Sequence, residues 1–281
     1  MEPLIRLSEV RFHHDPEAPD EHWAVRDVSL EIRAGEHVAI IGANGSGKST
    51  LAKLMCGLIR PVHGEVRVAG MNSRDPDHLW EIRRRVGLVF QNPENQIVGA
   101  TVEEDLAFGL ENLGISREEM ERRILRVLDQ TGLAPYRHES PHRLSGGFKQ
   151  RLAIAGIWVM NPDAIILDEA SSMLDPAARR ELSDLLRDRN REGAAIIRIT
   201  HRAEEAFEAG RVLVMDRGRL VLDLPSDELW PQADILERWG LDVPVEILLH
   251  RQLIRKGWPL PDSVSSREEL VNAICRCLSG I

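Results

Sequence analysis

A glycine-rich stretch near the N-terminus has the residue types and spacing of a phosphate cradle. It reads Gly42-Ala43-Asn44-Gly45-Ser46-Gly47-Lys48-Ser49-Thr50 and directly follows the apolar run 37–41. Its glycines let the backbone curl so that successive N–H groups, and the start of the following helix, point at an anion. Lys48 can then reach the β- and γ-phosphates of a nucleoside triphosphate, and the Ser49 hydroxyl can bind Mg²⁺. The stretch therefore predicts a nucleotide site that uses magnesium.

The plain alternative is a glycine-rich turn that binds no ligand. Glycine accounts for 21 of the 281 residues. A chance match to the whole pattern somewhere in the chain has odds on the order of one in a hundred. The position between an apolar run and an expected helix further favours the phosphate cradle.

A pair of carboxylates closes a second apolar run. Residues 164–169 read Ala-Ile-Ile-Leu-Asp168-Glu169. Adjacent residues on a strand point to opposite faces. We therefore expect Asp168 to face the magnesium ion and Glu169 to orient or deprotonate an attacking water. A buried strand followed by an ordinary acidic turn is the alternative, which the upstream glycine-rich stretch disfavours.

A third stretch, residues 144–151, lies between these two and reads Leu-Ser-Gly-Gly-Phe-Lys-Gln-Arg. Ser145 can cap a helix whose first N–H groups Gly146 and Gly147 leave accessible, so this helix end can bind a second anion. In isolation, a plain capped helix explains it equally well. The stretch resembles the signature sequence of ATP-binding cassette (ABC) proteins. All three stretches follow that family's order between residues 42 and 169.

Further matches extend the ABC resemblance over most of the chain, from residue 4 to about residue 223. Gln91 resembles the family's Q-loop, and His201 resembles its switch histidine. Residues 172–175, which end in Asp175, resemble the D-loop. In isolation, a histidine at the end of a strand is usually a solvated turn residue.

The resemblance also implies how the site works. Glu169 is expected to act as the base that activates water, His201 to position the γ-phosphate, and Gln91 to connect the site to a membrane partner. The residues expected to take part in catalysis are Lys48, Gln91, Glu169 and His201. Those expected to bind ATP are His14, Gly42, Ala43, Asn44, Gly45, Ser46, Gly47, Lys48, Ser49, Thr50, Ser145, Gly146, Gly147 and Asp175. Those expected to hold Mg²⁺ are Ser49, Gln91 and Asp168.

Two residues depart from the ABC pattern. Phe148 stands where the signature usually has Gln, which removes an amide from the expected interface. His14 falls where many ABC proteins place an aromatic ring that stacks on adenine. We therefore expect His14 to lie beside the adenine ring of ATP.

The ABC resemblance implies a head-to-tail dimer. Each ATP would lie between the glycine-rich stretch of one subunit and the signature of the other. Ser145 and its helix end would then present donors to the γ-phosphate only when ATP bridges the interface. Loss of the γ-phosphate after hydrolysis would weaken the bridge and let the dimer open.

The segment 91–112 narrows the resemblance. It reads QNPENQIVGATVEEDLAFGLEN and closely resembles the segment after the Q-loop in energy-coupling factor (ECF) transporter ATPases, especially the first member of their ATPase pairs. The cobalt and nickel uptake ATPases of that group share it. The resemblance implies a second ABC ATPase, in a heterodimer or a homodimer, a transmembrane coupling subunit and a small substrate-binding membrane subunit.

The function that this resemblance implies is ATP-driven import of a vitamin or a transition-metal ion. The chain would then act at the cytoplasmic face of the cell membrane, as a peripheral subunit. A soluble ABC ATPase that regulates a protein partner without transport is the alternative.

Three acidic residues, Glu103, Glu104 and Asp105, follow Thr101 at an expected helix start. The helix dipole favours negative charge there, which is sufficient to explain them. The alternative is that one carboxylate receives an arginine from a helix of the coupling subunit. The sequence leaves both explanations open.

A parallel sheet is needed to bring these stretches together. Residues 37–41, 86–90, 164–169 and 194–200 form apolar runs, which are typical of strands covered on both faces. Helices are expected between them, one after residue 50 and others at Thr101, Ser116, Ser145 and Pro176. This alternation predicts an α/β fold with a mostly parallel, doubly wound sheet. The resemblance adds the P-loop NTPase class, an antiparallel β subdomain and a helical subdomain over about residues 92–160.

Three segments predict antiparallel strands, and a change in composition marks the C-terminal part. Residues 4–12 and 24–33 alternate apolar and polar side chains, and 211–223 has the pattern of a hairpin with its turn at 216–218. Beyond Pro225 come Trp230, Trp239, Trp258 and a capping box from Ser266 to Glu269. We therefore expect an ABC ATPase domain over residues 1–224 and a small helical extension over 225–281 with a role in dimerisation.

The composition excludes several classes of function. With 45 acidic and 36 basic side chains, the formal charge is −9, which argues against nucleic acid as the main partner. The longest uncharged apolar stretch, 152–160, is far short of a membrane span, so we expect any membrane role to come through a partner. The 3 cysteines cannot form a closed set of disulfides or a zinc site, which favours a reducing cytosolic compartment.

Overall fold

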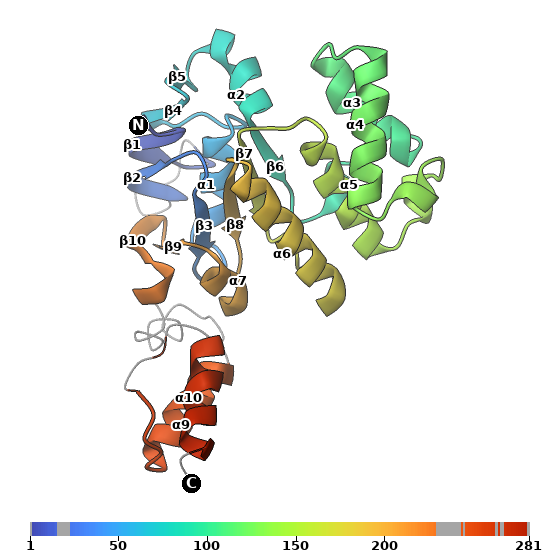
Figure 1. The fold of residues 1–281 in the computed structure, drawn as a ribbon. Coiled ribbons are helices and arrows are strands. Elements are labelled where there is room, and N and C mark those ends of the chain that lie inside the picture. Colours follow the sequence, from blue (N-terminus) through green and yellow to red (C-terminus); the bar gives the residue numbers. More distant parts are fainter. Residues whose placement is uncertain are drawn as a thin grey trace.

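A six-stranded sheet forms the centre of the molecule (Figure 1). The computed structural model describes residues 2–15, 23–228, 243, 245–261, 264 and 267–279. The strand order of the sheet is β10-β9-β3-β8-β7-β6. The strands are β3 (His37–Ile41), β6 (Val86–Val89), β7 (Ala164–Asp168), β8 (Ala195–Ile199), β9 (Arg211–Asp216) and β10 (Arg219–Pro225). Neighbours pair in parallel except β9 and β10, which form an antiparallel hairpin. The predicted mostly parallel sheet and the predicted hairpin are therefore confirmed.

The strands of this sheet distribute their side chains between two buried faces. In β3, Val38 and Ile40 belong to one hydrophobic core, whereas Ala39 and Ile41 belong to another. This division follows the two-residue period of a strand. Helix α1 (Lys48–Met55) covers the first face, and α6 (Pro176–Arg191) and α7 (Ala203–Glu208) cover the second. Because both faces are covered, the strands read as continuous apolar runs.

A second, four-stranded antiparallel sheet packs against α1. Its order is β2-β1-β4-β5, with β1 (Ile5–Phe12), β2 (Val25–Ile32), β4 (His63–Val68) and β5 (Met71–Asn72). Ile5 and Leu7 of β1 are buried while Arg6 and Ser8 are exposed, which confirms the predicted alternation. Side chains of this sheet, of α1 and of the six-stranded sheet share one core. The glycine-rich stretch between β3 and α1 is thus anchored at both ends.

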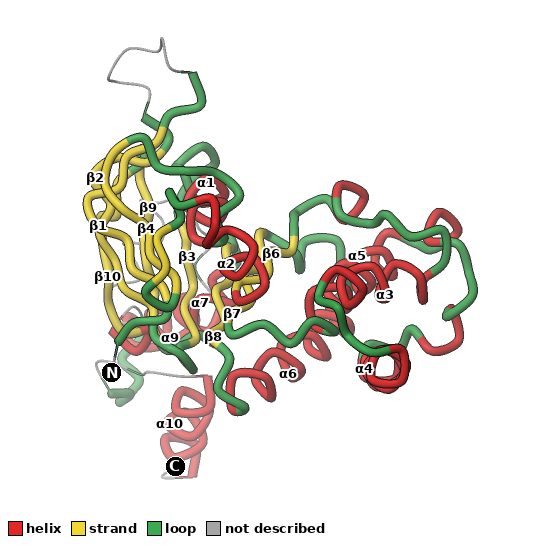
Figure 2. Tube along the Cα trace, turned by 90° about the horizontal axis from the view of Figure 1, so that it is seen from above, coloured by secondary structure: helices red, strands yellow, loops and turns green. Residues whose placement is uncertain are grey.

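Helices α3 (Val102–Asn112), α4 (Arg117–Gln130) and α5 (Gly146–Trp158) form a lobe on the β6 side of the sheet (Figure 2). The side chains of Thr101, Ser116 and Ser145 accept hydrogen bonds from backbone N–H groups in the first turns of these helices. The three predicted helix starts are therefore confirmed. The short α2 (Leu79–Arg85) leads directly into β6. Short 3₁₀ helices lie at Pro76–His78, Pro93–Asn95, Ala134–Tyr136, Pro141–Arg143 and Ser226–Glu228.

Two helices, α9 (Val245–Arg255) and α10 (Arg267–Ser279), form the C-terminal part of the described chain. Ile247 of α9 and Leu270 of α10 share a core with buried residues of α7 and β9. Trp258 packs against this core. Trp230, Trp239 and Ser266, the start of the predicted capping box, lie outside the described residues. Within the described ranges, the structure contains no helix that is both long and apolar enough to cross a membrane.

The half-buried His37 at the start of β3 is expected to make the fold less stable in acid. Burial, together with the positive charges of Arg198 and Arg187, lowers the pKa of His37 from 6.5 to about 4. Between these values the folded state keeps the ring neutral while the unfolded chain takes up a proton. The free energy of unfolding is therefore fully retained above pH 6.5 and falls as the pH drops toward 4.

We predict that His37→Gln makes the loss of unfolding free energy between about pH 7 and about pH 4.5 smaller by about 2 kcal/mol. Urea denaturation of both proteins at the two pH values measures this difference. An equal loss in the variant and the parent would contradict the role of His37.

Candidate functional site

One cavity, of about 780 Å³, brings most of the predicted site residues together. It is lined by His14, Ala24, Gly42, Ala43, Asn44, Gly45, Ser46, Gly47, Lys48, Ser49, Thr50, Gln91, Glu169 and His201. The loop after β3 and the start of α1 supply residues 42–50, and the loops after β6, β7 and β8 supply Gln91, Glu169 and His201. Parallel strands end at the same edge of a sheet, and that edge is where α/β proteins bind ligands. The topology therefore explains why residues so far apart in sequence meet.

Close backbone packing shapes the glycine loop. Gly42 and Gly47 have φ angles of 147° and 101°, which glycine adopts far more readily than other residues. A Cβ atom on Gly42 would lie 2.1 Å from the carbonyl oxygen of Met215. One on Gly47 would lie 2.1 Å from the carbonyl oxygen of Ala24. Glycine is thus required at both positions to let the loop approach its neighbours.

Ala24 and Gly218 also belong to the site, although neither is part of a motif in the sequence. The N–H of Gly218 donates to the carbonyl oxygen of Ser46 at 3.0 Å, and the Gly218 carbonyl accepts from the N–H of Arg26 at 2.7 Å. Ala24 lines the cavity. Gly218 lies in the predicted hairpin turn, but no local signal in the sequence indicates that this turn supports the glycine loop.

The ammonium group of Lys48 contacts the backbone of the glycine loop. Its Nζ donates to the carbonyl oxygens of Gly42 at 2.7 Å and Ala43 at 2.9 Å, and the residue is only 5% exposed. Burial lowers the pKa of the Lys48 ammonium, while the nearby Glu169 and Asp168 carboxylates favour its charged form. This ammonium group and the first N–H groups of α1 together can bind an anion.

Helix α1 begins at Lys48, inside the glycine-rich stretch. The prediction that it begins after residue 50 is therefore wrong. Gly47 occupies the position before the helix in a left-handed conformation. It turns the chain directly from the loop into the helix, so the loop and the helix end form one continuous site.

Ser49 and Asp168 place a hydroxyl beside a carboxylate. Ser49 Oγ donates to Asp168 Oδ1 at 3.0 Å, and Asp168 is only 6% exposed. Burial raises the pKa of Asp168, and the hydrogen bond from Ser49 opposes that rise. Hydroxyl and carboxylate oxygens are the hard ligands that Mg²⁺ prefers, and a cation would favour the ionised form of this buried carboxyl group. The pair therefore fits a magnesium site.

Glu169 lies in a turn after β7 and not on the strand. The strand ends at Asp168, and Glu169 has a φ of 51° with its N–H donating to the carbonyl oxygen of Ile199 at 3.0 Å. The prediction that strand alternation separates the two carboxylates is therefore wrong. A left-handed conformation at a residue other than glycine costs about 1 to 2 kcal/mol, which the surrounding contacts must offset.

Two predicted catalytic side chains converge on the carboxylate of Glu169. Gln91 Nε2 donates to Glu169 Oε2 at 2.8 Å, and His201 Nδ1 lies 3.7 Å from the same oxygen. The side chain of His201 is 54% exposed. A carboxylate placed between an amide and an imidazole in this way can hold a water and accept its proton.

His14 borders the same cavity from the end of the four-stranded sheet. Its Nε2 lies 3.2 Å from Thr50 Oγ1, and its ring meets the ring of Phe12 edge to face with the centroids 5.1 Å apart. The neighbouring His13 packs against Trp23 instead, with a centroid separation of 4.6 Å. His14 is the one of the two histidines that lines the cavity.

The signature residues lie outside this cavity, at the start of α5. Ser145 and Gly146 are exposed, and Ser145 Oγ accepts from a backbone N–H of its own helix. Asp175 caps α6 in the same way, by accepting from two backbone N–H groups. Within the described residues, one chain therefore does not bring Ser145, Gly146, Gly147 or Asp175 to the glycine loop. The chain has two separate helix ends that can each bind an anion.

Phe148, the departure in the signature, packs inside the helical lobe. Its ring lies 4.6 Å from that of Tyr136 between centroids, and the guanidinium of Arg151 lies 5.8 Å from the Phe148 centroid. The aromatic residue therefore adds packing and a cation–π contact to the lobe. It leaves Ser145 and Gly146 exposed at the helix end.

Three comparisons with known proteins find similar sequences and similar folds. The family model described as ABC transporter matches residues 25–172. The energy-coupling factor transporter ATP-binding protein EcfA1 of Caldanaerobacter subterraneus subsp. tengcongensis is 46% identical over 274 residues, which cover 97% of this chain and 99% of that protein. The structure of cbiO1 from Clostridium perfringens, part of the ABC transporter complex cbiONQ, has a TM-score of 0.74 at 30% identity and covers 89% of this chain and 100% of that chain. The dimeric ATP-binding cassette MJ0796 bound to ADP and Pi, in a post-hydrolysis state, has a TM-score of 0.72 at 30% identity and covers 79% of this chain and 98% of that chain.

The packing of the glycine loop predicts unequal costs for two alanine substitutions. Gly42→Ala places a methyl group against the Met215 carbonyl, whereas a Cβ on Gly45 meets nothing within 4 Å. Both residues have positive φ, so both variants carry backbone strain. We predict that Gly42→Ala lowers the free energy of unfolding by about 3 kcal/mol and Gly45→Ala by about 1 kcal/mol. Urea denaturation measures both values, and equal losses would contradict the steric role of Gly42.

Proposed function

Because the chain belongs to the ABC transporter family, among the ATP-binding proteins of energy-coupling factor transporters, we propose that it powers import of a vitamin or a transition-metal ion through membrane partners. Family membership makes it an ATP-binding subunit with ATPase activity. The observation that carries the mechanism is the convergence of Gln91 and His201 on Glu169 beside the glycine loop.

The glycine loop and Lys48 are proposed to hold the triphosphate of ATP. Backbone N–H groups at the start of α1 face the loop, and the Lys48 ammonium would bind the β- and γ-phosphates. Ser49 and Asp168 would hold Mg²⁺, with Gln91 as the third proposed ligand. When bound, Mg²⁺ would supply positive charge beside the phosphate oxygens. His14, which lines the same cavity, would lie beside the adenine.

Glu169 is proposed as the general base. Its carboxylate would accept a proton from the water that attacks the γ-phosphate, which yields ADP and phosphate. Gln91 donates to the same carboxylate oxygen that His201 approaches. The amide would restrict the rotamer of Glu169, and His201 would contact the γ-phosphate. Hydrolysis in this mechanism depends on positioning and electrostatics and requires no covalent intermediate.

We propose that two ATPase subunits complete the site between them. One chain holds its two anion-binding helix ends apart, and Ser145 and Gly146 at the start of α5 are exposed. An ATP held in the cavity of one subunit could therefore meet the start of α5 in a second ABC ATPase, in a heterodimer or a homodimer. The γ-phosphate would contribute to the contact only before hydrolysis, so the dimer would open afterwards.

A groove between α2 and the helical lobe is proposed to receive the transmembrane coupling subunit. It has a volume of about 540 Å³, and its wall includes the exposed side chains of Trp80, Val98 and Phe108. An exposed apolar groove fits the apolar face of a helix from a partner. Docking there would place the chain at the cytoplasmic face of the membrane, in a complex that also contains a substrate-binding membrane subunit.

We assign residues 1–224 to the ABC ATPase domain, with a helical subdomain over about residues 92–160, and residues 225–281 to a C-terminal extension. The extension is proposed to help hold the two ATPases together. The exposed apolar side chains of Val245, Leu248 and Val271 on α9 and α10 support this role, because such side chains often mark protein interfaces.

We predict that Glu169→Gln binds ATP normally but turns it over about 10² to 10⁴ times more slowly, the usual effect of losing a general base. The amide keeps the size of the side chain but accepts no proton. Single-turnover hydrolysis and equilibrium ATP binding together measure the two effects. Hydrolysis at the parental rate would exclude Glu169 as the base.

Two of the three acidic residues at the start of α3 already bind groups of their own chain. Glu103 pairs with Arg137, and Asp105 accepts from the N–H groups of Val98 and Gly99. The Glu104 side chain is exposed, and in the described part of the chain it has no ion pair within 4.0 Å. Glu104 is therefore the carboxylate best placed to receive a basic residue from the coupling subunit.

We predict that Glu104→Lys lowers uptake by at least about tenfold while ATP binding is unchanged, because like charges repel across the contact. Glu111→Lys, at the other end of α3, is the matched control with parental uptake expected. Unchanged uptake with Glu104→Lys would contradict the contact.

Copurification tests the choice between transport and the soluble regulatory alternative. If a detergent extract yields the chain without a polytopic membrane subunit, the soluble regulatory alternative is favoured.

A further inference from the structure

A buried arginine lies in the middle of the otherwise apolar strand β8. Arg198 is only 2% exposed. A guanidinium group remains charged in proteins, so its burial is costly unless carboxylates and hydrogen-bond acceptors surround it. What surrounds Arg198 therefore indicates what this charge does.

Three side chains from α6 and α7 surround the guanidinium. Arg198 Nη1 donates to Glu208 Oε2 at 2.9 Å and to Ser183 Oγ at 3.2 Å. Arg198 Nη2 lies 3.0 Å from Glu205 Oε1, which is ion-pair distance without hydrogen-bond geometry. The two glutamates lie one turn apart on α7, so Arg198 connects β8 to both helices.

Glu205 extends this network to the turn that carries the proposed base. The hydroxyl of Ser171 donates to Glu205 Oε1, and both residues are 6% exposed. Ser171 follows Glu169 by two positions. The N–H of Glu169 donates to the carbonyl oxygen of Ile199, which directly follows Arg198 in β8. The turn is thus attached to β8 through its backbone and to α7 through Ser171.

Glu205 also connects this network to the segment that follows His201. Helix α7 begins at Ala203, directly after the loop that carries His201, and Glu205 lies in its first turn. One contact, between Ser171 and Glu205, therefore joins the segment that follows Glu169 to the segment that follows His201. On the cavity side, the side chains of Glu169 and His201 approach to 3.7 Å.

We propose that Arg198 and Glu205, acting through Ser171, are positioning residues for hydrolysis. They hold the loops of Glu169 and His201 at a constant separation on the cavity side. The inference rests on the proposed function, since it assigns these residues to the ATPase reaction. A buried ion pair is suited to this role because its partners cannot exchange with water, and a shift of about 1 Å at reacting groups can cost as much as 10²-fold in rate.

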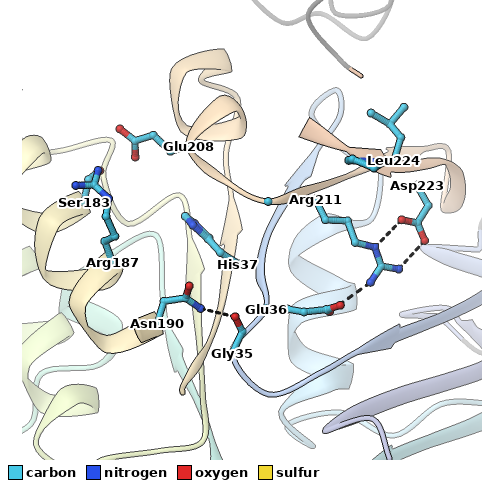
Figure 3. Close-up of a pocket in the computed structure, with 12 residues that line it drawn as sticks. Gly35, Glu36, His37, Ser183, Arg187, Asn190, Glu208, Arg211, Asp223 and Leu224 are labelled. Carbon is cyan, nitrogen blue, oxygen red and sulfur yellow. Dashed lines mark hydrogen bonds and ion pairs between the residues drawn. The ribbon is translucent and has the colours of Figure 1, made fainter. Parts of the chain in front are cut away.

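Ser183 and Glu208, which bind Arg198 from the side of a second cavity, provide control positions for a test of this proposal. Ser183 and Glu208 line this cavity, of about 670 Å³, together with His37 and Arg187 (Figure 3). In the same view, Arg211 pairs with Asp223 and Glu36 on the opposite wall. Ser183 thus contacts the same guanidinium as the network but does not contact the turn of Glu169.

The test compares two serine-to-alanine variants of the full chain, each assayed in the complex with its partner ATPase. Ser171→Ala removes the hydroxyl between the Glu169 turn and Glu205, whereas Ser183→Ala removes the outer hydroxyl from the same arginine. We expect Ser171→Ala to lower kcat about tenfold with the KM for ATP unchanged. We expect Ser183→Ala to keep the parental kcat and Ser171→Thr, which keeps a hydroxyl, to restore most of the rate.

A second pair of variants covers the charged partners. Glu205→Gln and Glu208→Gln each remove one negative charge beside Arg198, but only Glu205 also contacts Ser171. We expect a lower kcat for Glu205→Gln and a parental kcat for Glu208→Gln. A melting temperature for each variant shows whether it folds, and a loss of kcat only in proportion to lost folded protein overturns the proposal. Equal kcat for Ser171→Ala and Ser183→Ala also overturns it.

The parental chain and Glu169→Gln are measured in the same assay. If the parental chain does not hydrolyse ATP in the complex with its partner ATPase, or if Glu169→Gln is as active there as the parent, the proposed mechanism itself fails. If both behave as proposed and Ser171→Ala is fully active, only the positioning role of the network fails.

Discussion

The site depends on the close contact between the glycine loop and two backbone carbonyl groups that are remote in sequence. Gly42 lies against Met215 and Gly47 against Ala24, with no room for a Cβ atom at either position. These close contacts restrict the conformations that the loop backbone can adopt. The chain also passes directly from the loop into α1 at Lys48. A steric constraint on the backbone thus sets the position of the charge that binds the phosphates.

The parallel pairing of the strands sets the positions of the residues that are proposed to act on those phosphates. Strands β6, β7 and β8 are neighbours in the sheet, so Gln91, Glu169 and His201, which follow them, emerge at one edge. Strand β3 pairs with the other side of β8, so the start of α1 lies at the same edge, where Ser49 donates to Asp168. Chemistry that spans more than a hundred residues of sequence is therefore local in space, which agrees with the general rule that ligands bind at the carboxyl ends of parallel strands.

Much of this could be predicted because the relevant signals are local. The glycine loop, the apolar strands and the caps at Thr101, Ser116 and Ser145 depend on residues a few positions apart, and each predicted element is present. The errors arose where a contact from elsewhere decides the conformation. The hydrogen bond from Glu169 to Ile199 accompanies a turn where alternation along a strand was expected. Arg198, within a run that predicts an apolar strand, is buried because α6 and α7 supply acceptors for it.

The amino-acid sequence alone determined the chemistry that is possible here: a glycine loop with its lysine, two carboxylates after an apolar strand, a second capped helix end, and a family resemblance that the comparisons confirm. Only the tertiary structure decided which groups meet. It placed Gln91 and His201 on one oxygen of Glu169 and kept Ser145 and Asp175 away from the loop of their own chain. It also joined Ser171 to Arg198 through Glu205. The physical reason is that residue types and short spacings define what a side chain can do, whereas distances between remote side chains depend on strand order and on the packing of helices across the sheet.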